Sequence, residues 1–233
     1  MGPESGRNAV KTPKAIVVPH AGYVYSGPIA GSAYSLLDPS VVERVVLLGP
    51  AHRVWVGGVA ASTADVFATP LGAVRVDVGA RDALVAAGLV GLSDDAHAPE
   101  HSLEVQLPFL QVVLGDVPVL PLVVGDAAPS LVADVLDAVW GDAETLVVIS
   151  TDLSHYHDHA TAQDLDRATA AAIVARDESR IGPYAACGAA PLRGLLVAAQ
   201  RHDLGVSLLD LRTSADTAGD PDRVVGYGSF ALV

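Results

Sequence analysis

Three histidines each follow an apolar, strand-like run of the sequence. The three residues are His20, His52 and His155. A continuous apolar run of this kind is typical of a strand that is buried on both faces of an α/β sheet. Ligands of such sheets bind beyond the carboxyl ends of the strands, so three imidazoles at three strand ends could meet in one cleft. Imidazole is the commonest metal-binding side chain, and the pattern therefore predicts a metal site.

Two further stretches carry residue types that could take part in this chemistry. Cys187 is the single cysteine of the chain and is followed by Gly188 just ahead of an expected helix. A lone cysteine is usually an inert core residue, but a thiolate is favoured near a helix N-terminus and is a strong ligand for iron, copper or zinc. Glu100 and His101 precede another expected helix. They could simply favour its N-terminus, or His101 could line the cleft as an acid/base or as an outer partner of the site.

The stretch from Ser150 to His159 is the most polar part of the chain, and it contains Asp152 as well as His155. Its ordinary interpretation is a solvated loop with helix caps, and we assign His157 and His159 to that role. Other catalytic classes lack their motifs, because the sequence has no Walker-type phosphate loop, no dinucleotide fingerprint, no Gly-x-Ser-x-Gly and no Cys-x-x-Cys.

The elements that must position these residues alternate between strands and helices. We expect strands at about 14–19, 43–49, 56–61, 72–77, 117–124, 144–150, 205–213 and 223–232, and helices at about 28–37, 78–88, 102–114, 128–140, 160–176, 178–185 and 190–202. This order predicts an α/β fold with helices on both faces of a central sheet. The last two strands resemble a hairpin, so we expect a mixed, mostly parallel sheet. No linker divides the chain, and we predict one domain over 1–233 with a flexible N-terminal segment at 1–13.

Prolines make these expectations more specific. Pro28 suits the first turn of the helix at 28–37. Pro108 would kink or split the helix at 102–114. The two prolines in 117–124 favour an edge strand or a bend. Residues 69–72 read as the turn between the strands at 56–61 and 72–77, and residues 89–100 read as a loop.

Composition and charge limit the range of partners. Hydrophobic residues make up 51% of the chain and the mean hydropathy is +0.40, which suits a buried sheet. A formal net charge of −13 argues against nucleic acid and against anionic membrane surfaces. Every apolar run is interrupted by glycine, proline or charge, and the first residues lack the apolar core of a signal peptide. We therefore expect a soluble cytoplasmic protein.

Five ordered stretches resemble the signature segments of one family. They are residues 19–27 (PHAGYVYSG), 48–52 (LGPAH), 100–109 (EHSLEVQLPF), 150–156 (STDLSHY) and 187–191 (CGAAP). The ending at 226–228 (GYG) is similar to the last strand of the same family. Taken together, the stretches resemble the Memo family, which is the B component of the AmmeMemoRadiSam set. Ala189 and Ala190 stand where some relatives carry Arg-His, so no anion-binding role is carried over to those positions.

The resemblance implies a fold similar to that of the class III extradiol dioxygenases, which are non-haem iron enzymes. In those enzymes two histidines and a carboxylate hold Fe(II), and the Memo family resembles a variant with cysteine in place of the carboxylate. Carried over, this makes His20, His52 and Cys187 the metal ligands. His155 would be a fourth ligand or an acid/base, and His101 and Asp152 would support catalysis in the cleft. Fe(II) is the expected ion, with copper and zinc as rivals.

Three functions are compatible with this resemblance. The first is redox chemistry of the dioxygenase type on a small aromatic substrate. The second is a binding module, because some Memo-family proteins are associated with phosphotyrosine-containing peptides. The third is a role beside a radical-SAM protein and an AMMECR-type protein, in which the iron–sulfur chemistry would belong to the partner because this chain lacks the cysteines for a cluster. A homo-oligomer is compatible with all three.

Overall fold

The computed structural model describes residues 12–233, so most of the N-terminal segment expected at 1–13 lies outside the described residues. The strands are β1 (Ala15–Val18), β2 (Arg44–Pro50), β3 (Val59–Ala61), β4 (Val66–Thr69), β5 (Gly72–Arg75), β6 (Gly91–Leu92), β7 (Val119–Val124), β8 (Thr145–Ser150), β9 (His155–His157), β10 (Val206–Thr213) and β11 (Val224–Leu232). The helices are α1 (Tyr23–Tyr34), α2 (Val78–Ala86), α3 (Asp94–His97), α4 (His101–Glu104), α5 (Gln106–Leu114), α6 (Pro129–Ala138), α7 (His159–Val174) and α8 (Ala189–Arg201).

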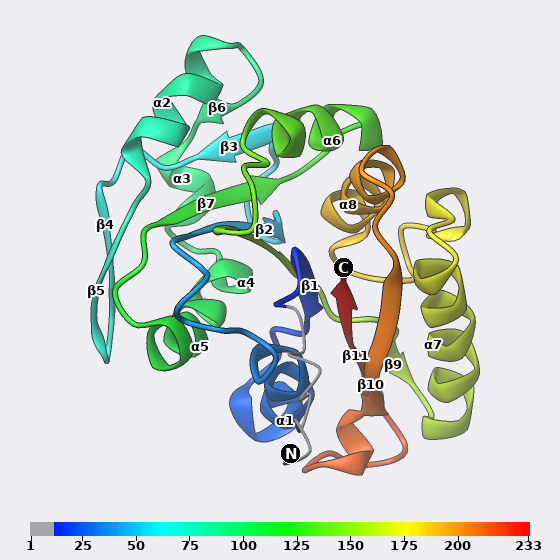
Figure 1. Ribbon diagram of the computed structural model, residues 1–233. Helices are drawn as coiled ribbons and strands as arrows, with labels where there is room; N and C mark the ends of the chain where they lie inside the picture. Colours follow the sequence, from blue (N-terminus) through cyan, green and yellow to red (C-terminus); the bar gives the residue numbers. More distant parts are fainter. Residues whose placement is uncertain (1–11) are drawn as a thin grey trace, which may run out of the picture.

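A single mixed sheet forms the centre of the fold (Figure 1). Its strand order is β10-β11-β1-β8-β2-β7-β3-β6, with β9 paired to β11, and β4 and β5 form a separate two-stranded sheet. The strands β1, β8, β2 and β7 are parallel to one another, whereas β11 runs antiparallel to β1 and β3 runs antiparallel to β7. The predicted single-domain α/β fold with a mixed, mostly parallel core is therefore confirmed.

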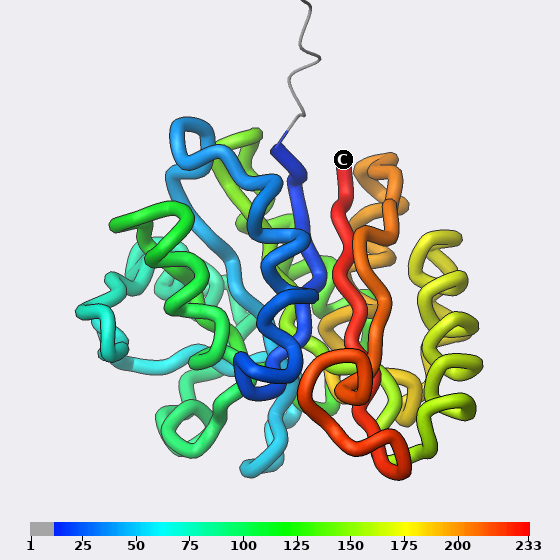
Figure 2. The backbone as a smooth tube through the Cα atoms, turned by 90° about the horizontal axis from the view of Figure 1, so that it is seen from below, coloured from blue at the N-terminus to red at the C-terminus, as the bar shows by residue number. Residues whose placement is uncertain are grey.

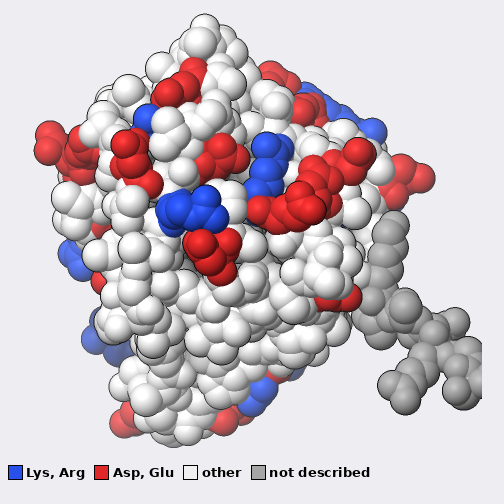
Figure 3. Space-filling model, turned by 60° about the vertical axis from the view of Figure 1, so that its left-hand side comes forward, with Lys and Arg blue, Asp and Glu red and all other residues white. Residues whose placement is uncertain are grey.

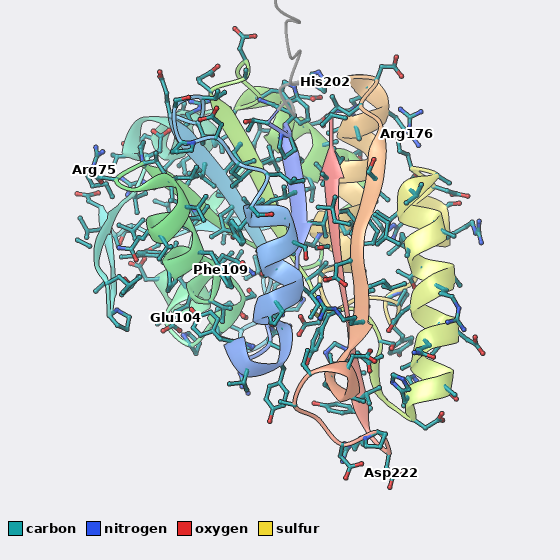
Figure 4. All side chains as sticks on the ribbon, turned by 60° about the horizontal axis from the view of Figure 1, so that its bottom comes forward. Arg75, Glu104, Phe109, Arg176, His202 and Asp222 are labelled. Atoms are coloured by element: carbon teal, nitrogen blue, oxygen red, sulfur yellow. The ribbon has the colours of Figure 1, made fainter. Side chains whose placement is uncertain are left out.

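Helices cover both faces of this sheet (Figures 1 and 2). Alternate residues of a strand point to opposite faces. Accordingly, Ile16 and Val18 pack in one apolar cluster with residues of α1, α4 and α5, while Ala15 and Val17 pack in the other with residues of α6, α7 and α8. On the first face, Phe109 of α5 points toward α1 and stacks on Tyr34 with ring centroids 4.8 Å apart (Figure 4). The parallel strands are buried on both sides, which explains their continuous apolar sequences.

Two of the proline expectations need correction. Helix α1 begins at Tyr23, so Pro28 lies inside the helix and not in its first turn. Strand β7 lies between β2 and β3, so it is not an edge strand although it contains Pro121. Pro121 removes only one possible ladder donor, and all six residues of β7 are buried, which favours a central place.

The third proline expectation is confirmed. The helix expected at 102–114 is split into α4 and α5, which meet at Val105. Pro108 then lies in the first turn of α5, where its missing N–H removes no intrahelical bond.

Short elements account for the other differences. The expected loop at 89–100 contains β6 and α3, and the turn at 69–72 joins β4 to β5 rather than the strands at 56–61 and 72–77. The polar stretch after β8 contains β9, which pairs with β11. The helix expected at 178–185 is only a single 3-10 turn at Glu178–Arg180. These elements are too short to carry a periodic apolar pattern, which is why the sequence does not reveal them.

Close packing of α8 against α6 depends on Gly194. A Cβ atom at this position would lie 2.3 Å from Cβ of Val132 in α6. We expect Gly194→Ala to destabilise the protein by about 1–2 kcal/mol, because overpacking outweighs the gain in helix propensity. The measurement is the midpoint of urea unfolding. Gly31→Ala in α1 is the control, since nothing lies within 4 Å of the new Cβ there, and it should not destabilise the protein.

Candidate metal centre

Three histidine side chains meet at the carboxyl edge of the parallel strands. His20 follows β1 and His52 follows β2, as expected, and the third member is His101, the first residue of α4. One ligand atom from each imidazole can be chosen so that all three lie within 4.8 Å of one another. His20 is only 3% exposed, whereas the other two rings face the cleft. The cluster could hold a metal ion.

The two least exposed rings of the cluster are those of His20 and His52. The Nδ1 atom of each ring contacts a polar side chain outside the cluster. His20 Nδ1 lies 2.9 Å from Oγ of Ser150, and His52 Nδ1 lies 2.9 Å from Oε1 of Glu100. Metal-binding histidines nearly always use their second ring nitrogen in this way, which fixes the orientation and tautomer of the ring. Each ring is thereby left with Nε2 as its free ligand atom. His101 is held less firmly, since its Nδ1 is 3.6 Å from the same carboxylate oxygen.

Glu100 holds both the backbone and the ring of His52 in place. Its carboxylate accepts the backbone N–H of His52 at 2.6 Å and that of Ser102 at 2.9 Å, in addition to the contact with the His52 ring. Burial alone would raise the pKa of Glu100, but these hydrogen bonds lower the pKa to about 2. The contact with Ser102 also makes Glu100 the N-cap of α4. Glu100 therefore both begins the helix and supports the His52 ring, while a role of His101 as an acid/base or outer partner stays a prediction.

A buried network supports the His20 side. Ser150 donates to the carbonyl of Ser102 at 2.6 Å, and Gln106 donates to Ser150 Oγ at 2.8 Å. The amide of Gln106 also accepts the hydroxyl of Tyr34 at 3.0 Å. Burial lowers the pKa of His20 to about 4, so the ring is neutral at physiological pH and can act as a ligand. Sequence reasoning missed the role of Gln106, although the residue lies inside the 100–109 segment.

Cys187 lies beside this cluster, just ahead of α8. Its Sγ is 3.4 Å from Nε2 of His20 and accepts the backbone N–H of Asp152 at 3.2 Å. Burial, together with the nearby charge of Asp152, raises the pKa of the thiol to about 12. Asp152 in turn accepts the backbone N–H of His20 at 2.8 Å, so it braces the loop that carries that ligand.

The cluster forms one end of a cavity of about 850 Å³, and the remaining histidines lie at different places around it. His155 lines the cavity, and its Nδ1 lies 2.8 Å from the carbonyl of Leu153. The expectation that His157 lies in a solvated loop is wrong, because His157 belongs to β9 and also lines the cavity. His159 is the first residue of α7 and contacts Thr213 Oγ1 at 2.8 Å, away from the cavity.

Comparison with known proteins identifies the family. The family profile described as Memo-like protein matches residues 1–231. The chain belongs to the Memo family. Relatives include a MEMO1 family protein, MK0963, from Methanopyrus kandleri, which is 39% identical over 93% of this chain and 82% of its own length. A MEMO1 family protein from Methanococcoides burtonii is 38% identical over 93% of this chain and 85% of its own length.

The Memo fold is also similar to that of a solved structure. The uncharacterized protein JW3007 from Escherichia coli K12 superimposes with a TM-score of 0.59 over 92% of this chain and 98% of that chain. At 14% sequence identity this likeness concerns the fold alone. Within residues 12–233 of this Memo chain, no helix has both the length and the apolar character needed to cross a membrane.

Proposed function

We propose that this chain binds Fe(II) through His20, His52 and Cys187 and carries out dioxygenase-type redox chemistry on a small aromatic substrate. The observation that supports the proposal most is the pairing of each deep imidazole with an outer partner through Nδ1, which leaves Nε2 of both rings free, together with the position of Cys187 Sγ 3.4 Å from Nε2 of His20. Metal sites need this support, whereas solvated histidines do not.

The donor set suits a transition metal. Imidazole nitrogen binds iron, copper and zinc, and a thiolate adds a softer ligand than the carboxylate of the usual two-histidine iron site. Copper and zinc therefore compete with iron for these residues. When bound, Fe(II) supplies open positions for dioxygen and substrate and the electrons that a reaction with dioxygen requires. One ligand atom from each of His20, His52 and His101 can be chosen so that all three lie within 4.8 Å of one another, so His101 is the residue that would complete a three-histidine site instead.

The chain's own residues supply binding and proton transfer. A carbonyl oxygen only accepts hydrogen bonds, so the contact with Leu153 places the proton of neutral His155 on Nδ1. Nε2 of His155 is then the atom that can take up a proton in the cavity. Asp152 and Glu100 act through other residues, since they hold the backbones of His20 and His52.

The first test is metal analysis of protein purified anaerobically without a His-tag. We expect about one iron per chain, and consumption of dioxygen when catechol-type substrates are added to the iron-loaded protein. Stoichiometric zinc or copper would support the metal site but would show that its ion is not iron. Protein with no stoichiometric metal would contradict the proposal, and binding of phosphotyrosine peptides or of radical-SAM and AMMECR-type proteins would then be measured.

Glu100→Gln tests the outer support of the site. We expect metal affinity to fall by about 10–100-fold, because the neutral amide holds the His52 ring less firmly and lowers its basicity. The measurement is a competition titration against a chelator with known affinity. Glu104→Gln is the matched control, because Glu104 belongs to the same helix but contacts none of the three histidines through a hydrogen bond or ion pair within residues 12–233. An unchanged affinity in Glu100→Gln would contradict the outer-partner role.

A further inference from the structure

The cavity next to the metal centre is lined by cationic and titratable groups although the chain is strongly acidic. Five of the eight histidines line it, together with Arg53. Asp152 is the single carboxylate among its lining residues, and it is 4% exposed and occupied with the backbone of His20. Imidazoles that bind a metal are neutral, so Arg53 is the lining residue that offers a full positive charge to a ligand, and the matching group on that ligand is an anion.

Arg53 differs from most arginines of the protein. On the face shown in Figure 3, basic side chains lie beside acidic ones. Arg75, for example, pairs with Asp116, and Arg81 pairs with both Asp65 and Asp82. Within residues 12–233, Arg53 has no ion pair and no side-chain hydrogen bond, although it is exposed at the mouth of the cavity. Its five N–H donors are therefore available to a ligand.

Tyr156 stands at the same mouth in a strained conformation. Its φ is 66°, a left-handed backbone that bulky side chains avoid. It is the extra residue of a β-bulge, since His155 and His157 pair with the consecutive residues Val225 and Val224. The ring lines the cavity but is 64% exposed, and the guanidinium of Arg223 covers it at 4.4 Å from the centroid. Strain at such a position indicates a role for the side chain beyond packing.

We propose that the mouth of this cavity binds a small aromatic anion, with the guanidinium of Arg53 against its anionic group and the ring of Tyr156 against its aromatic ring. Arg223 braces Tyr156. This small aromatic anion is the class of substrate that we assign to the proposed function. The inference rests on the proposed function only because it takes this cavity as the substrate site. Guanidinium groups bind carboxylates in a two-point geometry, and aromatic rings pack edge to face or offset, so the two contacts together select a planar anion.

The test compares benzoate with benzamide, which has nearly the same shape but no charge. Dissociation constants are measured by ligand-observed NMR at pH 8, above the ordinary imidazole pKa, on the full chain with metal and after treatment with a chelator. We expect benzoate to bind about tenfold more tightly than benzamide in both states. Arg53→Ala should reduce this ratio to about one while leaving benzamide binding unchanged. Arg75→Ala on β5 removes the same charge at a residue that does not line the cavity and should keep the ratio.

Tyr156→Gly provides the second arm. We expect it to weaken the binding of both probes by about fivefold while the melting temperature does not fall, because glycine relieves the left-handed backbone. Equal affinity for the two probes in the wild type would overturn the inference, and so would a benzoate preference that survives Arg53→Ala. A preference that disappears on chelation would place the anion on the metal and contradict it as well. If the chelated protein still prefers benzoate over benzamide, and this preference depends on Arg53, the inference is supported even when the protein contains no iron. The failure of the iron proposal and the failure of the anion proposal can therefore be distinguished.

Discussion

Replacing Cys187 with serine is expected to remove most of the bound iron, whereas replacing His101 with alanine is expected to leave the iron in place. Cys187 is half-buried, and its Sγ lies 3.4 Å from His20 Nε2. A serine hydroxyl is a much weaker ligand for iron than a thiolate, so the site loses one of its three anchors. The side chain of His101 is 45% exposed, and its Nδ1 is 3.6 Å from Glu100, beyond a normal hydrogen bond. A ring without that support is a poor candidate for a permanent ligand.

The measurement is iron content per chain after anaerobic purification of wild type, Cys187→Ser and His101→Ala. His52→Ala is the positive control, because either ligand set requires His52 and its loss should empty the site. The melting temperature of each metal-free variant shows whether the fold is intact. Iron that is retained in Cys187→Ser and lost in His101→Ala would show that the site is formed by three histidines, and it would reject the thiolate ligand.

The strand ends that carry His20 and His52 could be predicted because they depend on local signals. The parallel strands β1, β2 and β8 are buried on both faces, and each is an apolar run that stops at a proline, a glycine or a polar stretch. The carboxyl ends of parallel strands must meet at one edge, so the convergence of their loops follows from topology alone. The same reasoning placed His155 at this edge, where it lines the cavity.

The place of His101 could not be predicted in this way. Four short strands and two helices separate its helix from β2, and it reaches the site because Glu100 bonds to the loop after β2. No periodic pattern encodes that contact between positions 48 residues apart in the chain. The bulge at Tyr156 was missed for a similar reason, since β9 is held by backbone pairing to β11 and not by an apolar face. Side-chain partners such as Gln106 and Ser150 likewise become visible only when three separate elements are brought together.

His155 is the residue whose loss should slow turnover most without removing the metal. Its Nδ1 is committed to the carbonyl of Leu153, which leaves Nε2 as the proton acceptor in the cavity. We expect His155→Ala to reduce the rate of dioxygen consumption with a catechol-type substrate by about 10²–10⁴-fold, as is typical for loss of a general acid or base. Iron content should stay at the wild-type level.

His157→Ala is the matched control, because His157 lines the same cavity two residues further along β9 and is assigned no proton transfer. If His155→Ala loses its iron instead, the residue is a fourth ligand, and if it keeps both iron and turnover, the proton is transferred by another group.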